Sequence, residues 1–401
     1  MTPAAYELLD LGARWVHVIA GIMWVGNSLL FNWLDRTLAP PSRPGEGLQG
    51  ESWLLHSGGF YFVEKTQLAG QPLPRILHWF KWQAYTTWIS GAVLLVAVYY
   101  AGGRAALADP AVAPLHHATA VAIGVGAILL GVGAYELTQR LVAPRAPVLA
   151  NATLLAAFVV IVYALTHLLS GRAAFLHVGA LLASIMAGNV AMTIVPSQRE
   201  LVKSVAGAGR ADPAIAARAK RVSINNNYIT FPVIALMVSA HFPSVYSHRW
   251  SWLLLLLIVA TGAGGRHFMN VRFTTPWWRR ALFGTVIVST AVLYLLLTMS
   301  PNASRQSTAA DVPAVVTFAD ARHVIDRRCG ACHSLQPSDS SFGAAPAGIA
   351  FDLPSQIQSY AARIHERAVV TRTMPPANRT HITERERAIL GRWVEQGARV
   401  P

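Results

Sequence analysis

The sequence is poor in cysteine and in charged residues. Its 401 residues include only 2 cysteines, and Asp, Glu, Lys and Arg together make up 13% of the chain. Two cysteines are too few for a four-cysteine zinc site or for an iron–sulfur cluster. The low charge, combined with 53% hydrophobic residues and a mean hydropathy of +0.39, is typical of a membrane protein.

Long apolar stretches occupy most of the first 300 residues. A helix needs about 20 residues to cross the hydrocarbon core of a bilayer. Stretches of about this length are predicted at residues 11–34, 78–101, 115–137, 148–170, 173–196, 227–243, 250–270 and 278–300. The sixth is the weakest because it is short and Pro232 interrupts it. We therefore expect an all-α fold in which residues 1–300 form a polytopic membrane helix bundle of about eight spans.

Acidic residues are scarce beside basic ones, 19 against 33, which gives a formal net charge of +14. With eight spans, the loops on one side of the membrane carry 17 Arg and Lys residues, and the connections on the other side carry 3. Positive residues collect on the cytoplasmic side of membrane proteins. The sequence therefore predicts a multi-pass bacterial inner-membrane protein with both termini in the periplasm. It contains no nucleic-acid-binding motif, so the charge does not predict a nucleic-acid partner.

Both cysteines lie in one short stretch, "RRCGACHSL", at residues 327–335. Cys329, Cys332 and His333 form a C-x-x-C-H pattern, which attaches a c-type haem. The two thiols bind the haem covalently, and the histidine becomes an axial ligand of the iron. A structural zinc site would need a second ligand pair, and a thioredoxin-like site would need βαβ surroundings. Neither is found, so we predict one covalent haem c.

A second iron ligand is expected downstream, in "TRTMPPANRT". Met374 stands there in a polar, proline-rich stretch, which is a poor place for a core residue. His365 and His381 are the alternatives. Ligation by His333 and Met374 would suit an electron-transfer haem of raised potential.

The C-terminal region reads as a small helical domain. Thr383 and Glu386 form a predicted capping box that begins its last helix. We expect residues 316–401 to form a periplasmic class I cytochrome c domain, joined to the bundle by a linker at residues 301–315.

Histidines inside the predicted spans are candidate ligands, because ionisable groups in a bilayer are costly. His17 and His177 lie at similar depths on different spans, with His167 as an alternative to His177. Neutral imidazoles on facing helices could bind a b-type haem. For any one of these histidines, a place at the lipid–water interface is the competing explanation.

The cytoplasmic half of the bundle is also rich in polar residues. The predicted site there combines His78, Lys81 and Glu136 as catalytic residues with Asn226, His267, Asn270 and Arg272 as substrate-binding residues. A solvated interface could explain many of them. The alternative is a pocket rich in hydrogen-bond donors and cations, which would suit a small, planar, polar anion.

Three stretches, "RWVHVIAGIMWVGNSLLFNWLD", "GGFYFVEK" and "LHWFKWQAYTTWISG", resemble the membrane-bound, cytochrome c-fused urate oxidases of bacterial purine catabolism. The resemblance covers nearly the whole chain. It implies oxidation of urate to 5-hydroxyisourate, with electrons leaving through haem c. Within these motifs, the positions carried over are His17, His78, Trp79, Lys81 and Trp82.

Two functions are compatible with these patterns. In the first, urate is oxidised with Glu136 or His78 as the base, and electrons pass to a soluble or membrane cytochrome or a terminal oxidase in place of dioxygen. In the second, the chain is a quinol-oxidising cytochrome b–c electron-transfer protein without urate chemistry.

Overall fold

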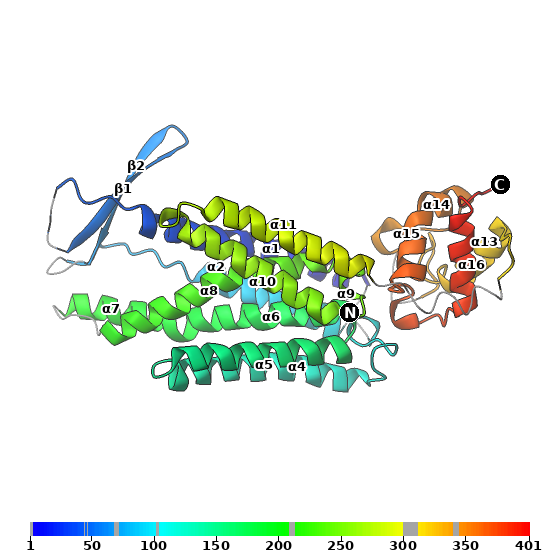
Figure 1. Cartoon of the computed structure of the whole chain (residues 1–401), viewed down its shortest axis with the longest axis horizontal. Coiled ribbons are helices and arrows are strands. Elements are labelled where there is room, and N and C mark those ends of the chain that lie inside the picture. The colour runs from blue at the N-terminus through cyan, green and yellow to red at the C-terminus, as the bar shows by residue number, and fades with distance from the viewer. Residues whose placement is uncertain are drawn as a thin grey trace.

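The computed structural model describes residues 3–43, 45, 47–67, 72–101, 104–207, 213–299, 312–339 and 345–401. It consists of an elongated helix bundle, a smaller helical domain at one end and a β-hairpin at the other (Figure 1). Most of the predicted linker, residues 301–311, lies outside the described residues.

The bundle contains eight long helical segments. They are α1 (Pro3–Thr37), α2 (Trp82–Leu95) with a π-turn at Val96–Tyr100, α4 (His117–Leu137) with a π-turn at Thr138–Val142, α5 (Pro147–Leu168), α6 (Gly171–Asn189) with a π-turn at Val190–Ile194 leading into α7 (Val195–Ala206), α8 (Pro213–Ser239), α10 (Ser251–Asn270) with a 3-10 turn at Val271–Phe273, and α11 (Trp278–Thr298). Two short helices, α3 (Arg104–Leu107) and α9 (Pro243–Tyr246), connect segments at the end next to the C-terminal domain. We call this the domain end and the opposite one the hairpin end.

Six of the described helical stretches are long and apolar enough to cross a membrane. They are Ala5–Thr37, His117–Val142, Pro147–Leu168, Gly171–Ala206, Ser251–Phe273 and Trp278–Thr298. The other two predicted spans are helical with different limits, since α2 begins only at Trp82 and α8 begins already at Pro213. The chain is therefore compatible with a multi-pass membrane protein, and the number of eight spans remains a prediction.

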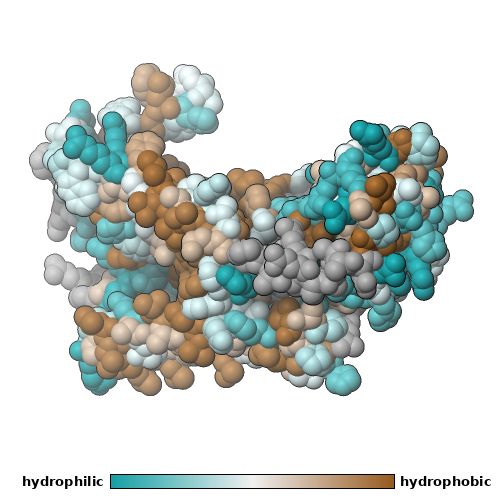
Figure 2. Space-filling view, turned by 45° about the vertical axis from the view of Figure 1, so that its right-hand side comes forward, coloured by the Kyte–Doolittle hydropathy of each residue, from teal (hydrophilic) through white to brown (hydrophobic). Residues whose placement is uncertain are grey.

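The outer surface of the bundle is apolar, and its interior is closely packed. Leu130 and Val148 are 75% and 81% exposed, as expected of side chains that face lipid. Figure 2 shows hydrophobic side chains over the flank of the bundle and mainly hydrophilic ones on the C-terminal domain. Inside, Gly262 of α10 lies against Pro232, where a Cβ atom would be 2.8 Å from the proline nitrogen. Small residues at such crossings let helix backbones approach closely.

The expectation of an all-α fold is wrong in one place. Strands β1 (Leu48–His56) and β2 (Gly59–Thr66) pair as an antiparallel hairpin. Its two-residue turn, Ser57–Gly58, has φ angles of 52° and 86°, which suit a type I′ turn and the right-handed twist of the strands. The alternating polar and apolar residues of this loop have the period of a strand.

The C-terminal domain has its own hydrophobic core, separate from that of the bundle. It contains α13 (Phe318–Arg328), α14 (Pro354–Ser359), α15 (Ala361–Ile364) with a π-turn at His365–Val370, α16 (Glu384–Glu395), and 3-10 turns at Pro346–Gly348 and Pro376–Asn378. Ile325, Leu390 and Trp393 are at most 2% exposed. The predicted capping box is confirmed: the Thr383 hydroxyl accepts from the Glu386 N–H, and the Glu386 carboxylate accepts from the Thr383 N–H.

Candidate functional site

A cluster of buried amides lies between α4, α6 and α8. The Asn189 side chain, which is fully buried, donates to Asn226 Oδ1 at 2.8 Å and to Tyr135 Oη at 3.0 Å. Asn225 donates to the same tyrosine oxygen at 2.9 Å, and Asn226 donates to the Met186 carbonyl at 3.0 Å. The run of three asparagines at residues 225–227 therefore serves to join three helices through side-chain hydrogen bonds.

The third asparagine extends the cluster to α10. Asn227 Oδ1 accepts from Arg266 Nε at 3.0 Å and from Asn270 Nδ2 at 2.7 Å. Arg266 is 3% exposed, and its guanidinium also lies over the Phe231 ring, 5.5 Å from the centroid. Within the described residues it forms no ion pair with a carboxylate. A buried cation without a counter-ion is costly, so Arg266 is the strongest candidate for binding an anion.

Several polar atoms of this region have no hydrogen-bond partner among the described residues. They are Arg266 Nη2, Asn270 Oδ1, Asn189 Oδ1, Thr193 Oγ1 and Gln83 Oε1. Gln83 belongs to the same region because its neighbour Ala84 packs against Val190, which follows Asn189. Buried polar groups are normally paired. The cluster thus offers one cationic donor and three amide oxygens to a polar ligand.

The structure brings together only part of the predicted site. Asn226 and Asn270 belong to the cluster, whereas His267 is exposed and hydrogen-bonded to the Tyr228 hydroxyl at 2.9 Å. Arg272 lies over the Phe273 ring, 4.6 Å from its centroid.

The three predicted catalytic residues also lie apart. Glu136 is paired with Arg140 at 3.0 Å and Arg218 at 3.8 Å, so its carboxylate is already neutralised. His78 is exposed and precedes α2. Lys81 lies between two indole rings, 5.4 Å from the Trp79 centroid and 5.7 Å from that of Trp82.

The two histidines predicted to hold a b-type haem lie in separate environments. His17 Nδ1 is hydrogen-bonded to the Thr87 carbonyl at 2.9 Å and to Ser90 at 3.2 Å, between α1 and α2. His177 is fully buried, with Nδ1 on the Ala173 carbonyl at 2.8 Å and Nε2 on the Tyr100 hydroxyl at 3.0 Å.

The His177 ring fills the space of the side chain that Gly124 lacks, since a Cβ atom there would be 2.6 Å from Nε2. Both nitrogens of His177 are engaged and its ring is enclosed, so this arrangement does not fit the His17–His177 pair as haem ligands.

The C-x-x-C-H stretch does fit a c-type haem by the chemistry of its donors. His333 Nδ1 donates to the Ile349 carbonyl at 2.9 Å, which leaves Nε2 with a free lone pair for a metal. Cys329 and Cys332 form no disulfide, and backbone hydrogen bonds to the Cys329 carbonyl tie the residues at 332 and 333 into one turn. Burial raises the pKa of the Cys329 thiol to about 12.

The loop that carries Met374 is held at both sides of the residue. The Met374 N–H donates to the Arg367 carbonyl at 3.0 Å, and Arg387 Nη1 donates to the Met374 carbonyl at 2.9 Å. Arg387 is 5% exposed and also donates to the Ala368 carbonyl. Cys329, Cys332, His333 and Met374 would hold a haem c between them. No group of three or more His, Cys, Asp or Glu residues within the described ranges is placed to hold a bare metal ion.

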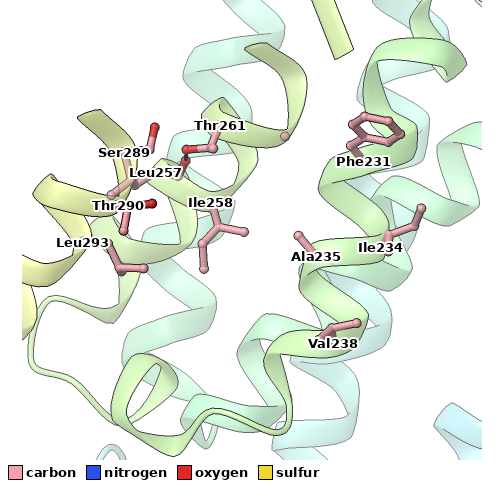
Figure 3. Close-up of a pocket in the computed structure, with 11 residues that line it drawn as sticks. Phe231, Ile234, Ala235, Val238, Leu257, Ile258, Thr261, Ser289, Thr290 and Leu293 are labelled. Atoms are coloured by element: carbon pink, nitrogen blue, oxygen red, sulfur yellow. Dashed lines mark hydrogen bonds between the residues drawn. The ribbon is translucent and has the colours of Figure 1, made fainter. Parts of the chain in front are cut away.

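A cavity of about 540 Å³ opens beside the polar cluster, between α8, α10 and α11 (Figure 3). Phe231, Ile234 and Val238 line one side, and Leu257, Ile258 and Leu293 line the other. Its polar groups are the hydroxyls of Thr261, Ser289 and Thr290. This lining suits an apolar occupant, so a polar planar anion is better matched by the amide cluster than by the cavity.

A helix bundle with a buried, unpaired cation and a separate domain with a haem-attachment motif are features of a membrane oxidoreductase. The profile of the family described as "Urate oxidase N-terminal" matches residues 3–298, and the chain belongs to this family. The match covers the bundle and the hairpin and ends before the C-x-x-C-H domain. No curated protein and no solved structure matches the chain.

Sequence reasoning omitted three members of the cluster from the predicted site. Arg266, Asn189 and Asn227 are buried and mutually linked through the asparagine run. One signal was available: Arg266 and Asn270 are four residues apart and so share a helix face. Which of the arginines near this membrane boundary turns inward depends on the neighbouring helices.

Proposed function

We propose that the protein is a membrane-bound urate oxidase of purine catabolism that converts urate to 5-hydroxyisourate and delivers the electrons through haem c to the respiratory chain. The family of the bundle supports the substrate class. The observation that carries the proposal is the buried Arg266 beside unpaired amide oxygens.

Urate matches this cluster in charge and in hydrogen bonding. At neutral pH it is a planar monoanion with three ring N–H groups and three carbonyl oxygens. Arg266 would offset the negative charge, and the amide oxygens of Asn189, Asn270 and Gln83 would accept from the ring N–H groups. A neutral purine with the same shape would leave the buried guanidinium without a counter-charge, so the site would favour the anion.

The reaction balances without dioxygen. Urate and one water give 5-hydroxyisourate, two protons and two electrons, with the new C–O bond formed by the water oxygen. When bound, haem c supplies a one-electron acceptor, so two electron transfers accompany each urate. The base remains a prediction, with His78 or Glu136 as candidates. The ion pairs of Glu136 would have to open before it could accept a proton.

We further propose that the hairpin end faces the cytoplasm and the C-terminal domain faces the periplasm of the inner membrane. The hairpin end holds most of the predicted cytoplasmic Arg and Lys residues. Asn189 and His177 are twelve residues apart on α6, so the cluster is about 18 Å further along the helix from the domain end than His177 is.

The test is anaerobic mixing of the purified, haem-loaded protein with urate. We expect the haem c absorption to change to that of the reduced form, with one urate consumed for every two haems reduced. 5-Hydroxyisourate should be detected by its ultraviolet absorption. Haem that stays oxidised with urate and is reduced by a quinol would overturn the proposal. Xanthine, which lacks the urate oxygen at C8, serves as the negative control.

A further inference from the structure

The C-terminal domain contacts the domain end of the bundle through two neighbouring segments. The Arg367 guanidinium donates to the Tyr246 hydroxyl of α9 at 3.5 Å. The 3-10 turn Pro376–Asn378 lies against α3, the short helix that follows α2. Both contacts come from the segment of the domain that includes Met374.

Arg367 is tied to Met374 as well as to the bundle. Its carbonyl accepts the Met374 N–H at 3.0 Å, and the contacting turn begins two residues after Met374. Movement of this segment away from the bundle would therefore carry the Met374 loop with it. The side of the domain that carries His333 includes a separate cleft, lined among others by Arg322, Arg327 and Asp352.

Tyr246 is equally well anchored on the bundle side. It is 6% exposed and belongs to the main core of the bundle, together with Tyr99 and Phe175. Its carbonyl packs directly on Gly171, the first residue of α6. The Tyr99 and Tyr100 rings lie 5.9 and 5.7 Å from the His177 ring. Closely packed side chains thus extend from α6 to the residue that meets Arg367.

We propose that Arg367 and Tyr246 are positioning residues that hold the Met374 side of the C-terminal domain against the bundle as its electron-accepting face. The opposite side, around His333, then remains free for a diffusing redox partner. This inference rests on the proposed urate oxidase function. It adds which face of the domain receives electrons from within the chain and which residues fix that face.

The experiment compares Arg367→Ala, Tyr246→Phe and the double variant in the full-length, haem-loaded protein. Arg363→Ala is the matched control, because Arg363 is an exposed arginine on the adjacent helix of the same domain. The first readout is hydrogen exchange of peptides that cover residues 104–107 and 366–378. The second is the rate of haem c reduction after anaerobic mixing with saturating urate. The haem c potential and urate affinity are measured alongside.

Loss of one hydrogen bond should lower the docked fraction, and so the reduction rate, about two- to tenfold. Exchange should rise in both peptides, while the potential and the urate affinity stay unchanged. Because the two groups contact each other, the double variant should be no slower than the slower single variant. The control should match the wild type in every measurement.

The failures of the two proposals are distinguishable. Wild-type haem c that urate does not reduce defeats the proposed function, while hydrogen exchange still tests the docking contact. Variants that are reduced at the wild-type rate, with or without a change in exchange, overturn the inference. Additive losses in the double variant also overturn it, because they show that the two residues act separately.

Discussion

Substitution of Arg266 by Gln tests whether the buried guanidinium binds the substrate anion. Glutamine keeps a long polar side chain and a donor, but it removes the positive charge. Asn227 would still accept from Asn270, so the asparagine run remains tied to α10. A hydrogen bond to a charged group contributes about 1.5–3 kcal/mol. The dissociation constant for urate should therefore rise about 10- to 150-fold.

The assay is equilibrium binding of radiolabelled urate to the haem-reduced protein, which cannot turn over. Xanthine, measured as a competitor at a pH where it is neutral, should lose much less affinity than urate does. Arg280→Gln removes an exposed arginine at the start of α11 and is the matched control. Equal losses for urate and xanthine, or for the two variants, would refute the reasoning. An unchanged haem spectrum and a monodisperse elution profile confirm that each variant is folded.

Four further outcomes are expected. Cys329→Ala should abolish covalent haem staining, while the bundle still inserts into membranes, because its spans carry their own topology signals. Met374→Ala should leave the haem attached but lower its reduction potential, measured by redox titration, because the thioether that favours ferrous iron is lost; an unchanged potential and spectrum would point to a histidine ligand. Gly124→Ala should destabilise the bundle by about 1–3 kcal/mol through overpacking against the buried imidazole, seen as a lower midpoint of thermal unfolding. The C-terminal domain should lose stability in acid: the Thr317 hydroxyl and N–H lower the pKa of Asp320, and hydrogen bonds from Thr383 and Arg328 lower the pKa of Glu386 despite its desolvation. The stabilisation from both carboxylates is present above their ordinary pKa and disappears as the pH falls through the lowered folded value, which denaturant unfolding at a series of pH values would show.

The sequence by itself determined the features that depend on local pattern. Six predicted spans coincide with helices that are apolar and long enough for a membrane, because span length and hydropathy need no knowledge of neighbours. The capping box at Thr383 and Glu386 formed where expected, since its partners are three residues apart. The urate oxidase motifs lie within the region that the family profile matches.

Only the tertiary structure decided which polar residues are buried together. His267 and Arg266 are adjacent on α10, yet one is exposed and the other is buried against Asn227. His17 and His177 have similar depth in the sequence pattern, but a glycine on a third helix and a tyrosine from a fourth segment enclose His177. Hydropathy gives the depth of a residue in the membrane. The direction in which its side chain points, and the partners it meets there, follow from how the helices pack.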